Sequence, residues 1–429
     1  MAREVTSHRG NRSGADPSVP STPSGPSQCQ RAGLSPRERE VLALVDEDDL
    51  LDVARALVRV PGTNPPGEEA ARAAVLAAVC RDRGLEVGVT EVAPGRPNLV
   101  ATLPGSDPGG GLLLLGHTDV VPVGEGWTVD PFGAEVRGGR LFGRGSADML
   151  GGLAACVAAM DTLRRAGVEL SGPVALAALV DEEETGLGIR RLVRELDGST
   201  WAGCLVAEPT DLRTIVAARG DCYLEIEVHG VAAHSGNPAD GRNAVYGAAE
   251  VVTDLERWHH ELADRAHPLV GPPTVSVGIV QGGRATSTVP DHCRISVDRR
   301  LLPGEDPAAV LAEVRSRIER LDLGSRGLTV EVSMPMDMPG FEVPVDHPFV
   351  VTADRALTDA GGPGLEPGGW TAACDGGFVA RDHGIPVVVQ GPGSVAEQAH
   401  RPDESVAVAD LALAARAYAL TALRLLARP

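Results

Sequence analysis

Acidic and histidine side chains recur along this chain directly after apolar segments that have the length of a β-strand. They are His117 and Asp119 after "LLLLG", the four acids 181–184 after "ALV", Glu208 after "LVA", His400 downstream of "PVVVQ", and Asp148 just before the alanine-rich segment "GGLAACVAAMDTLRRAG". One such residue would need no special role, because acids favour the first turn of a helix and a lone histidine is seldom a ligand. Five separate occurrences instead indicate a common site.

Imidazole nitrogens and carboxylate oxygens together form a mixed donor set that suits Zn²⁺ or a similar divalent ion. With three carboxylates and two imidazoles, one carboxylate could bridge two ions that lie roughly 3.5–4 Å apart. Asp119 follows His117 by two positions, so its carboxylate could orient the imidazole of a metal-binding histidine. The residue types therefore predict a metal centre with room for two ions.

The composition narrows the class of protein. The chain has 429 residues and a formal net charge of -20, which argues against a nucleic-acid partner because such proteins need a basic surface. We see neither the apolar core of a secretory signal nor an apolar run near the ~18 residues of a membrane span, so we expect a cytoplasmic protein without a membrane partner. Lysine is absent, which excludes lysine Schiff-base chemistry and a Walker-type lysine.

The order of apolar segments predicts the fold class that would bring these residues together. Near-continuous apolar strands alternate with alanine-rich helical stretches, which is typical of an α/β domain whose mostly parallel sheet is covered by helices on both faces. Ligands of such sheets bind beyond the carboxyl ends of the strands. Each candidate residue follows such an end or starts a helix, so the fold would place them in one crevice.

Changes in residue composition and in the spacing of apolar residues along the chain suggest four parts. Residues 1–35 are rich in Ser, Pro, Gly and Arg and read as a disordered tail. A helix starts near Ser35 and opens the catalytic domain, residues 36–216 and 338–429. Between them, residues 217–337 alternate apolar and polar positions and contain helical patterns at about 243–263 and 307–321, which indicates an inserted α+β domain.

Several motifs occur in a fixed order: "GHTDVVP", "GRLFGRGSADMLGG", "DEEETGLG", "AEPT", "VHGVAAHSGNPADGRNA" and "GPGSVAEQAHRPDE". As an ordered set they resemble the M20 family of dinuclear metallohydrolases, the group of acetylornithine deacetylase, succinyl-diaminopimelate desuccinylase and carboxypeptidase G2. The resemblance covers about residues 36–429. It implies a zinc-exopeptidase-like catalytic domain, in which the inserted domain serves as a lid and forms a homodimer.

The resemblance also implies roles for the residues at the strand ends. His117 and Glu208 would hold one zinc ion, Glu183 and His400 would hold the other, and Asp148 would bridge the two. Co²⁺ is possible at the same positions. Seven scattered cysteines without a C-x-x-C pair fit reduced thiols and give no reason to expect a finger-type zinc site.

The acidic run would supply the catalytic base beside a ligand. By resemblance, Glu182 is the general base that takes a proton from a metal-bridging water, and Asp119 orients His117. The family pattern D-E-E-x-x-G-x-G matches Asp181, Glu182 and Glu183, although three consecutive glutamates also allow Glu183 as base and Glu184 as ligand. If Glu182 is the base and Glu183 the ligand, Glu184 is an ordinary acidic residue at the start of a helix.

The inserted domain would complete the site. By resemblance, His234 reaches the partner subunit's site and stabilises the oxyanion, although it could also be a surface histidine at a strand end. Arg300 matches a position that grips the substrate carboxylate, for which a guanidinium is well suited. Arg219 and Arg299 are weaker candidates for this work, and any of the three arginines could instead form an ion pair on a strand face.

The chain departs from the family pattern at two positions, where Leu150 replaces a lysine and Ser287 replaces an asparagine. Neither removes a ligand, and the second bears on specificity. The leading hypothesis is therefore a metal-dependent hydrolase of the amide bond in an N-acyl amino acid, as in the acetylornithine deacetylase branch. A dipeptidase or carboxypeptidase acting on a short peptide is an alternative, and so is an inactive paralogue that only binds a ligand.

Overall fold

The computed structural model of the chain describes residues 33–428. The predicted disordered tail, residues 1–35, therefore lies almost entirely outside the described residues, as does Cys29. The first described helix, α1 (Pro36–Leu42), begins where the sequence predicts. Ser35 caps it: its hydroxyl oxygen accepts a hydrogen bond from the Glu38 backbone N–H at 3.2 Å, and the Glu38 carboxylate accepts one from the Ser35 N–H at 2.6 Å.

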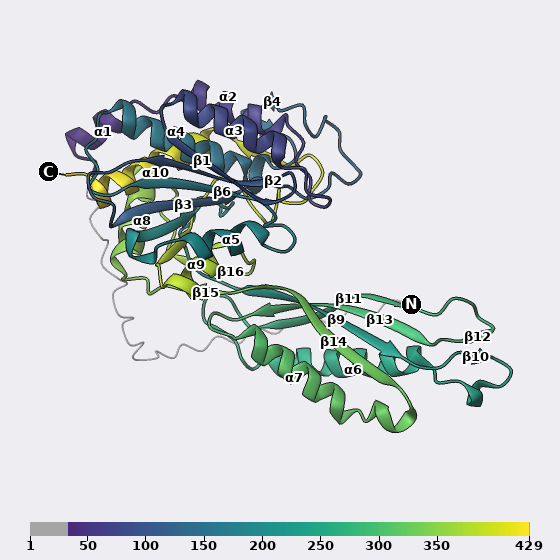
Figure 1. The fold of residues 1–429 in the computed structure, drawn as a ribbon. Coiled ribbons are helices and arrows are strands. Elements are labelled where there is room, and N and C mark those ends of the chain that lie inside the picture. Colours follow the sequence, from purple (N-terminus) through teal and green to yellow (C-terminus); the bar gives the residue numbers. More distant parts are fainter. Residues whose placement is uncertain (1–32, 429) are drawn as a thin grey trace, which may run out of the picture. The chain divides into compact units, whose positions relative to one another are not determined.

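A nine-stranded sheet forms the centre of the larger lobe (Figure 1). Its strands follow the order β1-β2-β6-β3-β7-β17-β8-β15, with β16 beside β8. Their bounds are β1 Glu86–Ala93, β2 Arg96–Leu103, β3 Gly111–His117, β6 Val174–Leu179, β7 Trp201–Val206, β8 Ile215–Ala218, β15 Phe341–Glu342, β16 Gly368–Trp370 and β17 Val387–Val389. The strands β6, β3, β7 and β17 run parallel, whereas β1, β2 and β15 pair antiparallel with their neighbours. The predicted fold class is confirmed.

Helices cover both faces of this sheet, and Figure 1 shows α2, α3 and α4 on one side of the strands and α5 and α9 on the other. The bounds are α2 Glu47–Val58, α3 Ala70–Asp82, α4 Gly151–Arg165, α5 Leu187–Glu195, α8 Pro348–Asp359, α9 Gly376–His383 and α10 Val408–Leu426. Buried leucine, valine and alanine side chains of the strands and helices form one continuous core. The parallel strands β3, β6 and β17 are buried along their whole length, as their apolar sequences require, and β7 is buried from its third residue onward.

Among the described residues, one helical segment, Ser146–Arg165, is long and apolar enough to cross a membrane. However, 94% of its most apolar stretch is buried inside the protein. All positions from Gly151 to Leu163 are buried, which is the pattern of a helix in a protein core.

The segment 220–338 folds into a separate antiparallel sheet with the order β11-β13-β9-β14. Its strands are β9 Gly220–His229, β11 Thr274–Gly282, β13 His292–Leu301 and β14 Thr329–Met338, and its helices are α6 Ala244–Leu262 and α7 Pro307–Arg320. Alternate residues of the strands, such as Leu224 and Ile295, form a second core with Trp258 of α6. Both helices lie where the sequence predicts them, while the domain boundaries themselves stay predictions.

Two small sheets complete the described chain. One pairs β10 (Ala233–His234) with β12 (Thr288–Val289), and the other joins β4 (Glu135–Arg137), β5 (Arg140–Phe142) and β18 (Ser405–Ala407) in the order β18-β5-β4. The second one ties the segment just after His400 to the segment just before Asp148. It therefore helps to bring two of the candidate ligands together.

Candidate metal centre

The carboxyl ends of the parallel strands meet at one edge of the central sheet, as the fold class requires. His117 is the last residue of β3, Asp181 to Glu184 follow β6, and Glu208 follows β7. His400 lies on the long connection from β17 to β18, and Asp148 lies in the turn Ser146–Leu150 that leads into α4.

The structure brings all five candidate ligands into two groups that share Asp148. In the first group, the Nε2 atom of His117 lies 3.3 Å from Asp148 Oδ1 and 3.3 Å from Glu208 Oε1. In the second, the Nε2 atom of His400 lies 3.4 Å from Asp148 Oδ2 and 3.1 Å from Glu183 Oε2. Each oxygen of the Asp148 carboxylate thus faces a different histidine, which is the arrangement that a bridging carboxylate needs.

The electrostatics of this cluster fit a divalent cation. Burial and the Asp148 carboxylate raise the pKa of Glu208 to about 7, and the same two causes raise the pKa of Glu183. Burial alone would lower the pKa of His117, but the carboxylates of Glu208 and Asp148 raise it well above its ordinary value. Glu183 Oε1 is also buried without a hydrogen-bond partner among the described residues. A cation would supply the missing positive charge and an electrophile for that oxygen.

Glu182 stands beside the two groups without belonging to either. Its Oε2 atom lies 4.0 Å from His117 Nε2, and its side chain is largely buried. Burial raises its pKa well above the ordinary value, although the neighbouring His117 acts in the opposite direction. A buried carboxylate with a raised pKa is better suited to take up a proton and pass it on than an exposed one. This placement favours the register with Glu182 as base and Glu183 as ligand.

Asp119 holds the acidic segment by its backbone. Its Oδ1 and Oδ2 atoms accept hydrogen bonds from the backbone N–H groups of Glu182 and Glu183, each at 3.2 Å. The sequence predicts that the Asp119 carboxylate orients the His117 ring, but the backbone of Asp119 makes the shorter contact. His117 Nδ1 lies 3.0 Å from the Asp119 carbonyl oxygen and 3.6 Å from the Asp119 carboxylate. The backbone carbonyl of Asp119 thus orients the His117 ring, and its side chain fixes the backbone of Glu182 and Glu183.

Two buried residues that the sequence did not single out support this arrangement. Glu404 accepts hydrogen bonds from the backbone N–H groups of Ala147 and Asp148, at 2.9 and 3.0 Å, so it fixes the turn that carries the shared carboxylate. The side-chain amide of Asn64 donates to Asp119 Oδ2 and to Asp181 Oδ1, both at 2.9 Å. Glu404 ends the motif "HRPDE" beside His400, which was the available signal, whereas nothing in the local sequence marked Asn64.

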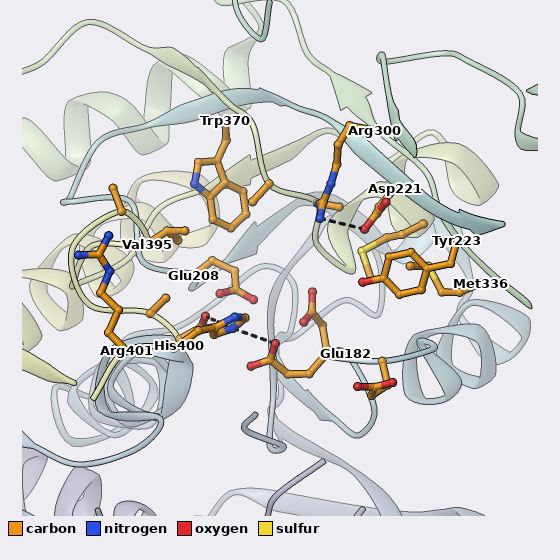
Figure 2. A pocket seen from close by; sticks show the side chains of 18 residues that line it. Glu182, Glu208, Asp221, Tyr223, Arg300, Met336, Trp370, Val395, His400 and Arg401 are labelled. Atoms are coloured by element: carbon orange, nitrogen blue, oxygen red, sulfur yellow. Dashed lines mark ion pairs between the residues drawn. The ribbon is translucent and has the colours of Figure 1, made fainter. Parts of the chain in front are cut away.

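A cavity of about 510 Å³ opens over the two groups (Figure 2). It is lined by Asp148, Glu182, Glu183, Glu184, Glu208, Asp221, Tyr223, Arg300, Met336, Met338, Trp370, Ala372, Ala373, Val395, Ala396, Ala399, His400 and Arg401. Arg300, the predicted carboxylate-binding residue, is among them. The guanidinium of Arg219 instead donates to the Val270 carbonyl oxygen, with Nε at 2.8 Å, and that of Arg299 on β13 is buried against Glu305.

Three other predicted positions lie outside this cavity. His234 is exposed on β10, and its Nδ1 accepts a hydrogen bond from the Gly236 N–H at 3.0 Å. Its expected role concerns a second subunit and stays a prediction. Of the two departures, Leu150 is fully buried in the core, and Ser287 is exposed, with its carbonyl oxygen accepting a hydrogen bond from the Ser235 N–H at 2.9 Å.

Comparisons with known proteins show the family and the fold of the chain. Residues 113–424 match the model of the peptidase family M20/M25/M40. An acetylornithine deacetylase of Photorhabdus laumondii is 33% identical over 345 residues, covering 77% of this chain and 84% of that protein. Among solved structures, an M20 family metallo-carboxypeptidase of Sulfolobus solfataricus superimposes with a TM-score of 0.74 at 19% identity, over 87% of this chain and 98% of that one. A dinuclear metal-binding M20 peptidase of Bacillus subtilis gives 0.67 at 18% identity, over 89% and 98%.

Proposed function

This chain belongs to peptidase family M20/M25/M40, and on that premise we propose that it hydrolyses the amide bond of an N-acyl amino acid, as an acetylornithine deacetylase does. The family makes the protein a metallohydrolase of the peptidase or deacylase type. The observation that carries the proposal is the pair of donor groups that share Asp148, with Glu182 beside them. The similarity to acetylornithine deacetylases over most of the chain favours a deacylase over a dipeptidase or carboxypeptidase.

We propose two divalent ions at this centre, Zn²⁺ by preference and Co²⁺ as a substitute. His117 and Glu208 would hold one, Glu183 and His400 the other, and Asp148 would bridge them. The mixed nitrogen and oxygen donors, their burial and the unpaired Glu183 Oε1 support this assignment. When bound, such ions lower the pKa of water and polarise a substrate carbonyl.

The protein's own residues would then move the proton. Glu182 takes a proton from the attacking water and later delivers it to the nitrogen that leaves, which a carboxylate with a raised pKa can do in both directions. Asp119 keeps Glu182 in place through the backbone N–H group at 3.2 Å. Arg300, which lines the cavity, would contact the substrate carboxylate through its remaining N–H groups.

We further propose a homodimer formed through the inserted domain. The strand β11 lies at the edge of its sheet, and the side chains of Ile279 and Val280 are 46% and 51% exposed there. An exposed apolar edge strand can pair with a second copy of itself. In such a dimer His234 would reach the partner's cavity and stabilise the oxyanion. The cytoplasmic location and the lack of nucleic-acid and membrane partners remain predictions from the sequence.

Hydrolysis of a small panel tests the proposed function. The purified chain, stripped of metal and then loaded with Zn²⁺, would be offered N-acetyl amino acids and dipeptides. We expect activity only in the loaded protein, with N-acetyl amino acids preferred. Glu182→Gln with metal retained should lose at least ~100-fold in kcat. Preferred cleavage of dipeptides would assign the chain to the peptidases of its family, and a loaded protein that cleaves neither class would refute the proposal.

A further inference from the structure

The two histidines of the candidate metal centre are held in different ways. His117 ends the buried strand β3, so its pairing with β6 in the sheet fixes its backbone. His400 instead reaches the cavity from the loop 390–404 (Figure 2), its side chain is 54% exposed, and its φ of 62° is left-handed. Within residues 33–428, the backbone of His400 forms no hydrogen bond. His400 therefore depends on neighbouring residues for its place at the centre.

A second loop contacts this segment three residues beyond His400. The connection from β3 to β4, residues 118–134, carries Thr128, which donates two hydrogen bonds to the Asp403 carboxylate. The Thr128 backbone N–H donates to Oδ1 at 2.8 Å and the Thr128 hydroxyl donates to Oδ2 at 2.7 Å. Both bonds lower the pKa of Asp403, so the acceptor is ionised at neutral pH and the bonds are of the stronger, charge-assisted kind.

The backbone of the loop needs such support. Asp403 has a φ of 53°, so it and His400 are two left-handed residues other than glycine within four positions. A residue with a side chain costs free energy in this region and keeps the conformation only where its surroundings hold it. The bonds from Thr128 supply part of that support, because they fix the Asp403 side chain against a separate segment of the chain.

The segment that carries Thr128 is itself fixed. Trp127 Nε1 donates to the Val123 carbonyl oxygen at 2.8 Å, and the guanidinium of Arg144 lies over the Trp127 ring, 5.1 Å from its centre. Arg144 also donates from Nη2 to the Val123 carbonyl oxygen at 3.1 Å and from Nη1 to the Arg401 carbonyl oxygen at 3.3 Å. This buried guanidinium thus joins the two loops, and Thr128 projects from an ordered support.

We propose that Thr128 and Asp403 are positioning residues for His400, because their contact holds the loop 390–404 in the geometry in which His400 meets Glu183. This inference rests on the proposed function through its metal centre, and it adds the residues that keep the exposed half of that centre in place. The histidine and the glutamate of the other group lie at the ends of β3 and β7, so they do not depend on this loop.

Loss of the contact should weaken the binding of one ion and spare the other. A loop that keeps the binding geometry for only about one tenth of the time lowers the apparent affinity of its site about 10-fold. We expect this loss for Asp403→Gly, because glycine adopts the left-handed backbone readily and lacks the carboxylate. Thr128→Val, which keeps the N–H but lacks the hydroxyl, should lose about 3-fold. Thr128→Ser keeps the hydroxyl and should bind both ions as the wild type does.

Metal binding tests the proposal without an activity assay. Stepwise competition of the Zn²⁺-loaded protein with a chelator would measure the two affinities, and anomalous scattering from crystals at limiting Zn²⁺ would assign each affinity to its group. Thr253→Val is the matched control, because it removes an exposed hydroxyl that donates to the Ala249 carbonyl oxygen at 2.8 Å on α6. The double variant Thr128→Val/Asp403→Gly should bind as Asp403→Gly does, because a single contact carries both effects.

The outcomes separate this inference from the proposed function. If Asp403→Gly weakens both ions equally or weakens neither, or if Thr128→Ser loses as much as Thr128→Val, the positioning role is overturned while the deacylase function stands. A protein that shows the selective loss but cleaves neither N-acetyl amino acids nor dipeptides would support the positioning role and refute the proposed function. A wild type that binds fewer than two ions would overturn the positioning role together with the metal centre.

Discussion

Replacing Glu404 with glutamine would test whether this buried carboxylate holds Asp148, the candidate ligand shared by the two groups, in position. Glu404 is 1% exposed and accepts four hydrogen bonds. Its Oε1 atom faces the N–H groups of Ala147 and Asp148, and its Oε2 atom faces the Gly145 N–H at 3.0 Å and Arg144 Nη1 at 2.7 Å. A glutamine has the same shape but only one acceptor oxygen.

The expected loss in the free energy of unfolding depends on which hydrogen-bond donors lose their acceptor when Glu404 becomes glutamine. The amide oxygen should stay with the buried guanidinium of Arg144, because charge-assisted hydrogen bonds are the stronger ones. The amide nitrogen then faces the N–H groups of Ala147 and Asp148. Each unsatisfied buried donor costs about 1–3 kcal/mol, so we expect a loss of about 2–6 kcal/mol in the free energy of unfolding. The released turn should also weaken Zn²⁺ binding by about 10- to 100-fold.

Chemical denaturation of the metal-free protein and competition of the loaded protein with a chelator would measure the two effects separately. Glu135→Gln serves as control, because Glu135 is 49% exposed and lies 3.9 Å from its only ion-pair partner in the described chain, Arg137. That variant should change the free energy of unfolding by less than about 0.5 kcal/mol. If Glu404→Gln unfolds more easily yet binds Zn²⁺ as the wild type does, Glu404 supports the fold alone and the positioning argument is wrong.

Three further predictions follow from the same contacts. Zn²⁺ affinity should rise with pH. Hydrogen bonds to Asp148 and Glu183 raise the pKa of His400 to about 10, and Zn²⁺ must displace the proton that this histidine carries. A Zn²⁺ affinity that chelator competition finds unchanged from about pH 6 to about pH 9 would contradict this. Asp119→Asn should lower kcat/KM by about 10- to 100-fold, since an amide cannot accept from both backbone N–H groups, and steady-state kinetics that match the wild type would show that these bonds are dispensable. Val280→Arg should shift the protein from dimer to monomer in sedimentation velocity, because it places a charge on the exposed edge of β11; an unchanged dimer would place the interface elsewhere.

The sequence predicts the central sheet well because its parallel strands are buried on both faces. The strand β3 has no polar side chain before its last residue, His117, and β6 is apolar at every position, so the polar residues at their ends stand out. The sequence does not indicate the antiparallel pair β1 and β2 at the sheet edge, because β1 is largely exposed and carries no run of buried residues. Edge strands are defined by pairing with a distant segment, which a local pattern does not record.

The residues of the candidate site likewise fall into those that the local sequence predicts and those that it does not. The clustering of the five candidate ligands is predictable because each follows a strand end or starts a helix, and the fold class brings those positions to one edge. Glu404 and Asn64 act through partners far away in the chain, Glu404 on the turn around Asp148 and Asn64 on Asp119. Their importance arises only when the chain is folded. The same holds for Glu184, whose position in the acidic run suggested a helix start and whose side chain lines the cavity instead.

Anomalous scattering from crystals grown with Zn²⁺ tests the central claim most directly. We predict two zinc ions per chain, one at His117 and Glu208 and one at Glu183 and His400, with Asp148 shared by both. Glu182 should lie near both ions without binding either. A single ion, a pair that Asp148 does not bridge, or an ion held by Glu182 or Glu184 would contradict the account.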